Sequence, residues 1–594
     1  MHRSPDSPRF AWAIFLGPAS LAAAFAAALF FQGVEYRALV AGFALALAAV
    51  ALTRSRPTPV TTDLWVLLLG ALLVAATLQS RVFSLSLSAL LWTSWFFCAY
   101  VVARSCDSRF LPAAIGGVAA LACVITLWRH AALGADLGGP FLYRHMFSAV
   151  VLVGVMLLAE TAPATARWRP AAFGAAALLA FLLIGLSGSR GVMIAGAIGL
   201  GFVAFASPRE RRADWVWFAA GALLGLLVAN VAAHGLVTGR LATLADPAQA
   251  GSSRIRMWVS VGALLADRPW FGHGPGILFA VWPPFRDPTD GSDGFYAHNG
   301  YLDLALTAGI PAAAVAALSL RSALNAGWSG VRRGAASPWT LGALAVIAAH
   351  AMVDFNLMVP AIWLLAGLCA GSLAAQAPAV TGALAAGALR VGTVSAVVCA
   401  TGLAAYAATS AVGFAAHARA ERSWLHGDPV AALASVNRAI RWWPLSDNGY
   451  LLRATIVLSA ALQGPTAAKN PAAIPALAGA RLDVASAHAR NPLRPATYRV
   501  AAGLDLAAAR LGVDGDGAAA AVSHLRAGLA LNPRDQQTRM QLADALWLDG
   551  RRHEALWTLV DGLDYPHARN EAFLERVRAT RRGILEGGAQ GGHR

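Results

Sequence analysis

Charged side chains are scarce in this sequence. Only 13% of its 594 residues are Asp, Glu, Lys or Arg, while 57% are hydrophobic. A soluble protein of average composition has about 25% charged residues. Apolar runs of about 20 residues recur along the chain, and a run of that length spans a bilayer as a helix. The composition therefore predicts an all-α, polytopic membrane protein and argues against a soluble one.

Cysteine is scarce too. None of the five cysteines falls in a long polar region, so we expect neither a disulfide framework nor a cysteine metal site. The glycine turn at 272–276 is not followed by the Gly-Lys-Ser/Thr of a phosphate-binding loop, so it is interpreted as a sharp turn only. No Asp-x-Asp motif stands near it, and a metal role for Asp287, Asp290 and Asp293 is the less favoured alternative. We expect no metal and no cofactor.

Run lengths and helix breakers predict about thirteen membrane spans. The N-terminal apolar run resembles a signal peptide, but the many spans after it favour an uncleaved first helix. The predicted spans are residues 10–31, 36–53, 62–79, 84–103, 110–131, 146–162, 170–188, 191–206, 215–236, 298–319, 339–354, 359–376 and 391–414.

The arginines predict the orientation of these spans. Every second loop carries most of them, for example Arg209, Arg211 and Arg212, and positive loops mark the cytoplasmic side of a membrane. The net charge of +16 therefore does not indicate a nucleic-acid partner. We expect a membrane protein with a cytoplasmic N-terminus. Arg190, the 237–297 loop and the C-terminal region then lie on the outer side.

Three regions are predicted along the chain. Residues 1–414 form a transmembrane domain with a large external loop at 237–297, residues 415–586 form an α-helical repeat domain, and residues 587–594 form a disordered tail. One unit, LNPRDQQTRMQLADALWLDGRRHEALWTLV, resembles a tetratricopeptide repeat, and an ordinary helical bundle is the alternative. In this unit we expect Leu542, Ala543 and Leu546 to form the first packed face, Gly550 to make the turn, and Ala555 and Leu556 to continue the second helix.

Two arginine motifs lie on the predicted outer side. Arg190 follows a Ser-Gly-Ser turn, where small residues let another group approach and a guanidinium can hold two phosphate oxygens. Arg254 and Arg256 begin an amphipathic helix predicted over 252–266, with a serine cap and N–H groups that also favour anions. The alternatives are an interfacial anchor for Arg190 and contact with lipid headgroups for the helix arginines.

Histidines mark two further segments. His298 opens an apolar span in AHNGYLDLALTAGIP, with Asn299 beside it to orient it, and histidine suits a general base near neutral pH. His350 and Asp354 in HAMVDFNLMVP share one helix face, and ionisable residues at membrane depth are usually functional. A helix-capping histidine and a structural ion pair are the respective alternatives. GPFLYRHMFSA adds supporting residues at another outer helix end, Tyr143, Arg144 and His145.

In this order the motifs resemble the signature segments of the O-antigen ligase and polymerase superfamily. The resemblance rests on SGSRG, RIRMW followed by RPWFGHGPG, and AHNGYLDLALTAGIP, and covers roughly residues 140–360. It implies a metal-independent, inverting glycosyltransferase with an undecaprenyl diphosphate-linked glycan as donor. It also implies a bacterial inner-membrane protein whose active site and C-terminal domain are periplasmic. It also implies that Arg190 and Arg254 hold the diphosphate, with Arg256 as the alternative to Arg254, and that His298 is the catalytic histidine.

The chemistry of such a transfer agrees with these residues. Negative charge develops on the departing diphosphate, where fixed arginines stabilise it, and the acceptor hydroxyl gives a proton to a histidine. The acceptor is a saccharide, lipid A core or a protein hydroxyl, so ligase, polymerase and protein oligosaccharyltransferase remain open. The repeat domain carries no catalytic constellation and is expected to bind a protein partner or the acceptor.

Two other classes compete with the enzyme. A transporter or flippase would show internal repeats and broken helices at the midplane of the membrane, whereas the polar residues here gather outside. The second is a scaffold in which the membrane domain only anchors the repeats. Its catalytic-looking residues would then be replaceable, which separates it from an enzyme.

Overall fold

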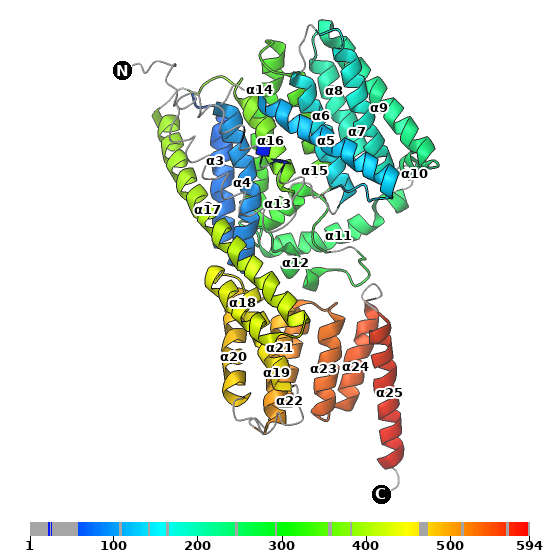
Figure 1. Ribbon diagram of the computed structural model, residues 1–594, viewed down its shortest axis with the longest axis vertical. Helices are drawn as coiled ribbons and strands as arrows, with labels where there is room; N and C mark the ends of the chain where they lie inside the picture. The colour runs from blue at the N-terminus through cyan, green and yellow to red at the C-terminus, as the bar shows by residue number, and fades with distance from the viewer. Residues whose placement is uncertain are drawn as a thin grey trace. The chain divides into compact units, whose positions relative to one another are not determined.

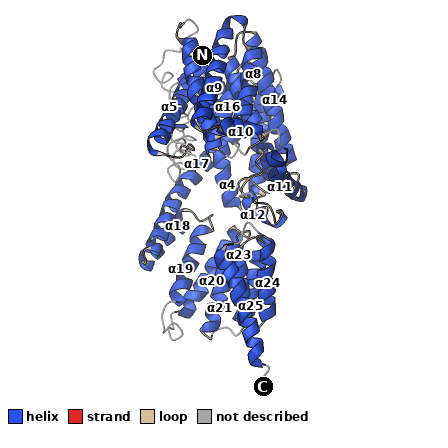
Figure 2. Ribbon diagram, turned by 90° about the vertical axis from the view of Figure 1, so that its right-hand side faces the viewer, coloured by secondary structure: helices blue, strands red, loops and turns tan. Residues whose placement is uncertain are grey.

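The computed structural model describes residues 58–591 with short gaps, and five isolated positions between 19 and 26. The gaps are residues 106–109, 140–142 (Tyr143 is described), 162–165, 244–246, 292–293, 355–358, 381–382, 463–472, 513–515 and 566–569. Every described residue in regular secondary structure is helical (Figure 2). The protein is therefore the all-α, polytopic helical membrane protein that its composition predicts. Most of span 10–31 and all of span 36–53 lie outside the described residues.

The described chain divides into two compact units. The first comprises residues up to 76, 87–252 and 297–408, and the second comprises 77–86, 253–296 and 409–594. The helices that lie wholly or mainly in the first unit are α3 (Thr61–Leu78), α4 (Phe83–Ser105), α5 (Phe110–Leu133), α6 (Arg144–Thr161), α7 (Arg169–Ser187), α8 (Arg190–Ala206), η1 (Arg209–Arg211), α9 (Arg212–Ala232), α10 (Leu236–Ala242), α13 (Gly300–Ala308), α14 (Ile310–Arg332), α15 (Pro338–Ala351), α16 (Pro360–Ala374) and α17 (Ala383–Leu425).

Seven helices of the described chain are long and apolar enough to cross a membrane. They are α3 to α7, α9 with the turn before it, and the Val398–Leu425 part of α17. Helices α8, α15 and α16 are apolar but shorter. All of these helices coincide with predicted spans.

The predicted span at 298–319 is wrong as a single helix. The structure has α13 over Gly300–Ala308 and then α14 over Ile310–Arg332, separated at Gly309 with φ 90° and ψ 163°. Glycine adopts that backbone conformation without strain, and Pro311 in the first turn of α14 suits a new helix start. His298 and Asn299 therefore precede a short helix of their own.

Glycines set how closely the helices of the first unit pack. Helices α7 and α9 lie side by side (Figure 1), and a Cβ on Gly221 would stand 2.0 Å from the carbonyl oxygen of Gly174. Helices α8 and α15 meet in the same way, since a Cβ on Gly199 would stand 2.8 Å from the carbonyl oxygen of Gly342. Small residues allow such approach between membrane helices. The Gly199–Gly342 contact fixes the register that brings the start of α8 to the end of α15.

The second unit contains residues 253–296, most of the loop predicted to be external, and these residues are called the external segment. Helix α11 (Pro247–Asp267) enters it, followed by α12 (Leu278–Val281) and η2 (Pro283–Phe285). The glycine turn is sharp as predicted, with φ of 65° at Gly272, 109° at Gly274 and 72° at Gly276. A Cβ on Gly274 would stand 2.5 Å from Ser80 Oγ, so only glycine fits there.

The rest of the second unit is a series of helices in which each packs on the next. They are α18 (Pro429–Trp442), α19 (Asn448–Leu462), α20 (Ala473–Arg490), α21 (Pro495–Arg510), α22 (Gly517–Leu531), α23 (Gln536–Leu548), α24 (Arg552–Val560), η5 (Asp561–Asp564) and α25 (Glu571–Gly591). The predicted boundary near 415 falls inside α17, and α25 continues into the predicted tail. The assignment to tetratricopeptide repeats stays a prediction. The expected packed face is buried, because Leu542, Ala543 and Leu546 belong to one core, which also contains Ala555.

Candidate active site

Asp354, just past the end of α15, is the centre of a histidine cluster in the first unit. Its carboxylate oxygens lie 3.6 Å from His298 Nδ1, 3.3 Å from His145 Nε2 and 3.7 Å from His350 Nε2. The Asp354 side chain is 10% exposed, His350 is fully buried, and His298 and His145 are 23% and 28% exposed. A carboxylate buried to this degree needs partners that can carry positive charge, and histidines can do so.

The backbone around His298 is held in an uncommon conformation. His298 has φ 50°, a left-handed value that costs free energy in a residue other than glycine. The flanking hydrogen bonds fix it: Ala297 N donates to Asp303 Oδ1 at 2.8 Å, and Gly300 N donates to the Asp354 carbonyl at 3.0 Å. Strained residues held in this way concentrate at functional sites.

Asn299 makes its hydrogen bonds with backbone groups. Its side-chain oxygen accepts from Tyr301 N and Leu302 N and so caps α13, and its Nδ2 donates to the Met352 carbonyl at 3.0 Å. The residue therefore ties the His298 turn to the segment just before Asp354.

The SGSRG turn reaches the same cluster from α8. Gly188, with φ 65°, ends α7, and Arg190 begins α8. A Cβ on Gly191 would lie 3.5 Å from His350 Nε2, so the residue after Arg190 packs directly on the cluster. The Arg190 side chain is half-buried, and its Nη1 donates to Thr243 Oγ1 at 2.7 Å.

The GPFLYRHMFSA segment forms a third side of the cluster. The Tyr143 carbonyl accepts from Met146 N and starts the first turn of α6, which places His145 near Asp354. The Tyr143 and His145 rings lie 5.5 Å apart between centroids. Arg144 is exposed at the first position of α6.

Two residues of this region were missed from the sequence. Asp303 is fully buried, and an acidic residue inside an apolar helix was the signal that could have revealed it. Arg240 on α10 lies over the SGSRG turn, since a Cβ on Gly188 would stand 3.3 Å from its Nε. No sequence signal marks Arg240, because its approach to Gly188 depends on how α9 and α10 fold back.

The remaining predicted arginines lie on α11. This helix begins at Pro247, so the predicted serine cap and the free N–H groups at 252–256 are wrong. Pro247 at the first helical position is the correct signal for the helix start, whereas the predicted cap was Ser252 or Ser253. Arg254 is half-buried and belongs to the second unit, and the side chain of Arg256 lies outside the described residues.

The other polar groups of the external segment make structural contacts. His273 is 3% exposed, its Nε2 lies 3.0 Å from the Leu264 carbonyl, and burial lowers its pKa. Asp287 accepts from Thr289 N, and Asp290 pairs with Arg286 at 3.0 Å. Asp293 lies outside the described residues. Among the described residues no group of three His, Cys, Asp or Glu side chains could hold a metal ion.

A family comparison covers the centre of this region. Residues 175–317 match the family described as O-Antigen ligase, a segment that includes Arg190, Arg254 and His298 and ends before Asp354. No curated protein matches the chain. The matched segment is about a quarter of the sequence. The match confirms the resemblance of this part of the chain to the O-antigen ligase and polymerase superfamily, and it supports a membrane glycan ligase or polymerase type of function.

Proposed function

We propose that this protein transfers a glycan from undecaprenyl diphosphate to an acceptor hydroxyl, without a metal and with inversion at the sugar. One observation carries the proposal: segments far apart in sequence meet at Asp354. They bring His298, His145 and His350 around one carboxylate, with the residue after Arg190 packed on His350. A proton acceptor beside a group that binds phosphate is what this reaction requires.

His298 is the proton acceptor in this mechanism. Its Nδ1 faces Asp354 Oδ1, so the carboxylate stabilises the imidazolium that forms when Nε2 takes the acceptor proton. The acceptor oxygen forms a bond to the anomeric carbon as the bond from that carbon to the diphosphate oxygen breaks. The electron pair leaves with the diphosphate, and attack from the opposite face inverts the sugar.

Arg190 holds the diphosphate. It is the first residue of α8, and Ser189 before it makes no side-chain cap hydrogen bond. The first backbone N–H groups of a helix have no partner inside the helix and carry its positive dipole end, so they favour an anion at the same place as the guanidinium. A second donor-binding arginine, Arg254 or Arg256 of α11, rests on the resemblance to the superfamily alone.

The arginine alternation supports a site on the face opposite the cytoplasm. With the resemblance to the O-antigen ligase superfamily, that face is the periplasmic side of a bacterial inner membrane. The lipid-linked donor is then anchored in the same membrane as the spans and can reach the site from the surrounding lipid. The helices after α17 serve the acceptor or a protein partner on that same side.

The direct test is transfer by the purified full-length protein, with lipid-linked glycan, a soluble acceptor and EDTA. We expect free undecaprenyl diphosphate and one new glycosidic bond of inverted configuration. Movement of the donor across vesicle membranes without transfer would favour a flippase instead. Activity that EDTA abolishes and a divalent ion restores would overturn the metal-free mechanism.

The acceptor is identified in a deletion strain. Loss of glycan-capped lipid A indicates a ligase, and collapse of long chains to one repeat unit indicates a polymerase. Loss of a glycoprotein indicates a protein oligosaccharyltransferase. All three acceptors present a hydroxyl to the same histidine, so the chemistry of the site is common to them.

A further inference from the structure

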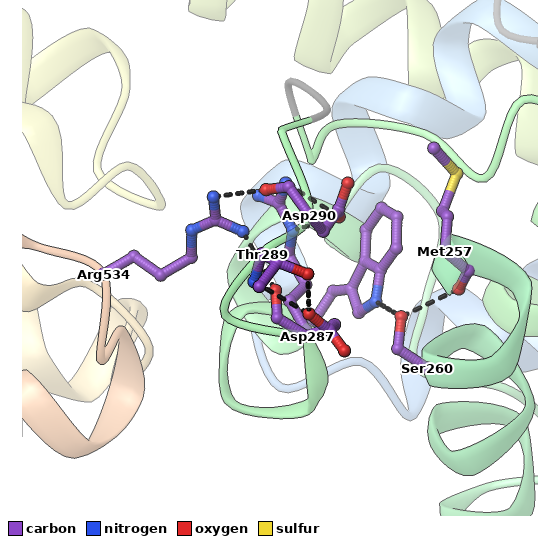
Figure 3. A network of polar contacts seen from close by, with 8 residues as sticks. Met257, Ser260, Asp287, Thr289, Asp290 and Arg534 are labelled. Carbon is purple, nitrogen blue, oxygen red and sulfur yellow. Dashed lines mark hydrogen bonds and ion pairs between the residues drawn. The ribbon is translucent and has the colours of Figure 1, made fainter. Parts of the chain in front are cut away.

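Arg534 joins the helical series of the second unit to the external segment. It lies in the turn between α22 and α23, and its guanidinium donates to the backbone carbonyls of Asp287, at 3.5 Å, and Asp290 (Figure 3). The turn is shaped locally, because Arg534 N donates to Asn532 Oδ1 at 3.2 Å. Burial, and then the neighbouring Arg286, lower the pKa of Arg534. Carbonyl dipoles on two residues offset that loss of hydration.

The loop that Arg534 grips is itself closely bound. Arg286 donates from Nε and Nη2 to Asp290 Oδ2, both at 3.0 Å, and Asp290 is 2% exposed. The Arg286 guanidinium also lies over the Trp282 ring, 5.3 Å from its centroid. A Cβ on Gly294 would stand 2.0 Å from Arg286 Nη1, so the chain closes directly over this pair.

Trp282 carries these contacts to α11. Its side chain is fully buried, and its Nε1 donates to Ser260 Oγ at 3.0 Å. Ser260 in turn donates to the Met257 carbonyl at 2.8 Å, one turn earlier in α11 (Figure 3). Arg254 stands six residues before Ser260, about 9 Å along the helix axis.

We propose that Arg534 is a positioning residue for donor binding, which acts through the 286–290 loop and Trp282 on α11 and so on Arg254. This rests on the proposed function, because it takes Arg254 as a donor-binding residue. The helical series then does more than bind an acceptor or a partner. It sets the position of a donor-binding helix.

Steady-state kinetics of the full-length protein separate this role from others. Arg534→Ala should raise the donor KM roughly tenfold and leave kcat within about twofold, as expected for loss of hydrogen bonds from a charged group. Arg534→Lys keeps the charge but not the planar fork, so it should restore the KM only in part. Full rescue by lysine would reduce the role of Arg534 to charge and overturn the positioning. The matched control is Arg526→Ala on α22, whose partner is Glu554 within the same helical series and whose loss should leave the KM unchanged.

The route through Trp282 has its own test. Trp282→Phe keeps an aromatic ring but removes the N–H that donates to Ser260 Oγ. It should raise the KM for the glycan donor by a smaller factor than Arg534→Ala does. Because both residues act on one chain of contacts, the double variant should raise the KM less than the product of the two single effects. Two independent effects that multiply would overturn the route.

Amide hydrogen exchange tests whether Arg534 positions α11, and it needs no assay of activity. In Arg534→Ala, exchange should rise in residues 283–291 and in α11, and not in α7 or α9. Unchanged exchange in α11 overturns the inference. If the unaltered protein transfers no glycan, the proposed function fails, and the exchange result still decides whether Arg534 positions α11. Increased exchange with an unchanged donor KM would show that α11 does not bind the donor.

Discussion

The cluster at Asp354 and the network at Arg534 are both built from charged and polar side chains, but they differ in kind. The first joins one carboxylate to three histidines at 3.3–3.7 Å, and two of those histidines are more than 20% exposed. The second joins Arg286 to a buried carboxylate at 3.0 Å and Arg534 to backbone carbonyls. The cationic groups of this network are guanidiniums, which do not exchange protons near neutral pH.

This difference indicates that the Asp354 cluster suits proton transfer, whereas the Arg534 network holds the backbone in place. Histidines at loose distances around a carboxylate can take up and release a proton without breaking the structure. A guanidinium in close contact with buried acceptors holds backbone in place, and its removal leaves those acceptors unsatisfied. Substitutions in the first region should therefore change kcat, and substitutions in the second should change binding of the donor.

The largest effect is expected for His298→Ala. Loss of a general base usually lowers the rate by about 10²- to 10⁴-fold, while the donor KM should stay within about twofold. The measurement is initial rate against donor concentration. His234→Ala is the matched control, because His234 also has a left-handed backbone, with φ 48°, but is exposed on the α9–α10 connection. An active His298→Ala enzyme would remove the mechanism.

Asp354→Asn should come next, with kcat lower by about 10²-fold. The amide keeps the shape of the side chain and the backbone contact with Gly300, but it removes the charge that stabilises a protonated His298. Glu421→Gln is the control, since Glu421 also follows a histidine by four residues in a helix, with His417 Nε2 at 3.3 Å. Equal losses of kcat in the two variants would mean that Asp354 acts through folding. Thermal unfolding of both proteins would check this.

Arg190→Ala should raise the donor KM by about 10- to 100-fold, because a hydrogen bond to a charged group contributes about 1.5–3 kcal/mol. Lysine should rescue it poorly, since an ammonium lacks the planar fork. Arg211→Ala, at the opposite end of the α8–α9 pair, should leave the KM unchanged. Normal donor binding by Arg190→Ala, measured directly with the lipid-linked glycan, would sink the assignment and turn attention to Arg240.

The sequence predicted the motifs of the site better than their backbone setting. His298, Asp354 and His145 were singled out separately, and the structure brings them together. Apolar runs with an ionisable residue at one end are strong local signals. Charge alternation also assigned those ends to one side of the membrane, which made a common site reasonable before the packing was known.

The missed features depend on choices that local patterns do not decide. Gly309 splits a span that hydropathy alone joins, although Gly309-Ile310-Pro311 carries the breaker signals. The start of α11 at Pro247 was not predicted, because Ser252 and Ser253 offered a more familiar helix cap. The Arg534 contact joins residues 244 positions apart, and no periodicity reports such a contact.

The smallest effect concerns Asn299, which belongs to the first unit and bonds to backbone groups beside the Asp354 cluster. Asn299→Ala removes the cap of α13 and the bond to the Met352 carbonyl, so the free energy of unfolding should fall by about 1–2 kcal/mol. Because Ala297 and Gly300 still hold the His298 turn from both sides, kcat should fall less than in Asp354→Asn.

Asn299→Asp separates the two parts of that role. It keeps an oxygen to cap Tyr301 N but cannot donate to Met352, so it should recover stability more than kcat. Ser337→Ala, which removes the cap at the other end of α15, serves as the control for a cap that matters only to stability. If Asn299→Ala and Ser337→Ala lose similar stability and keep the same kcat, Asn299 is a cap alone. The backbone of His298 would then be set by Asp303 and Asp354 without it.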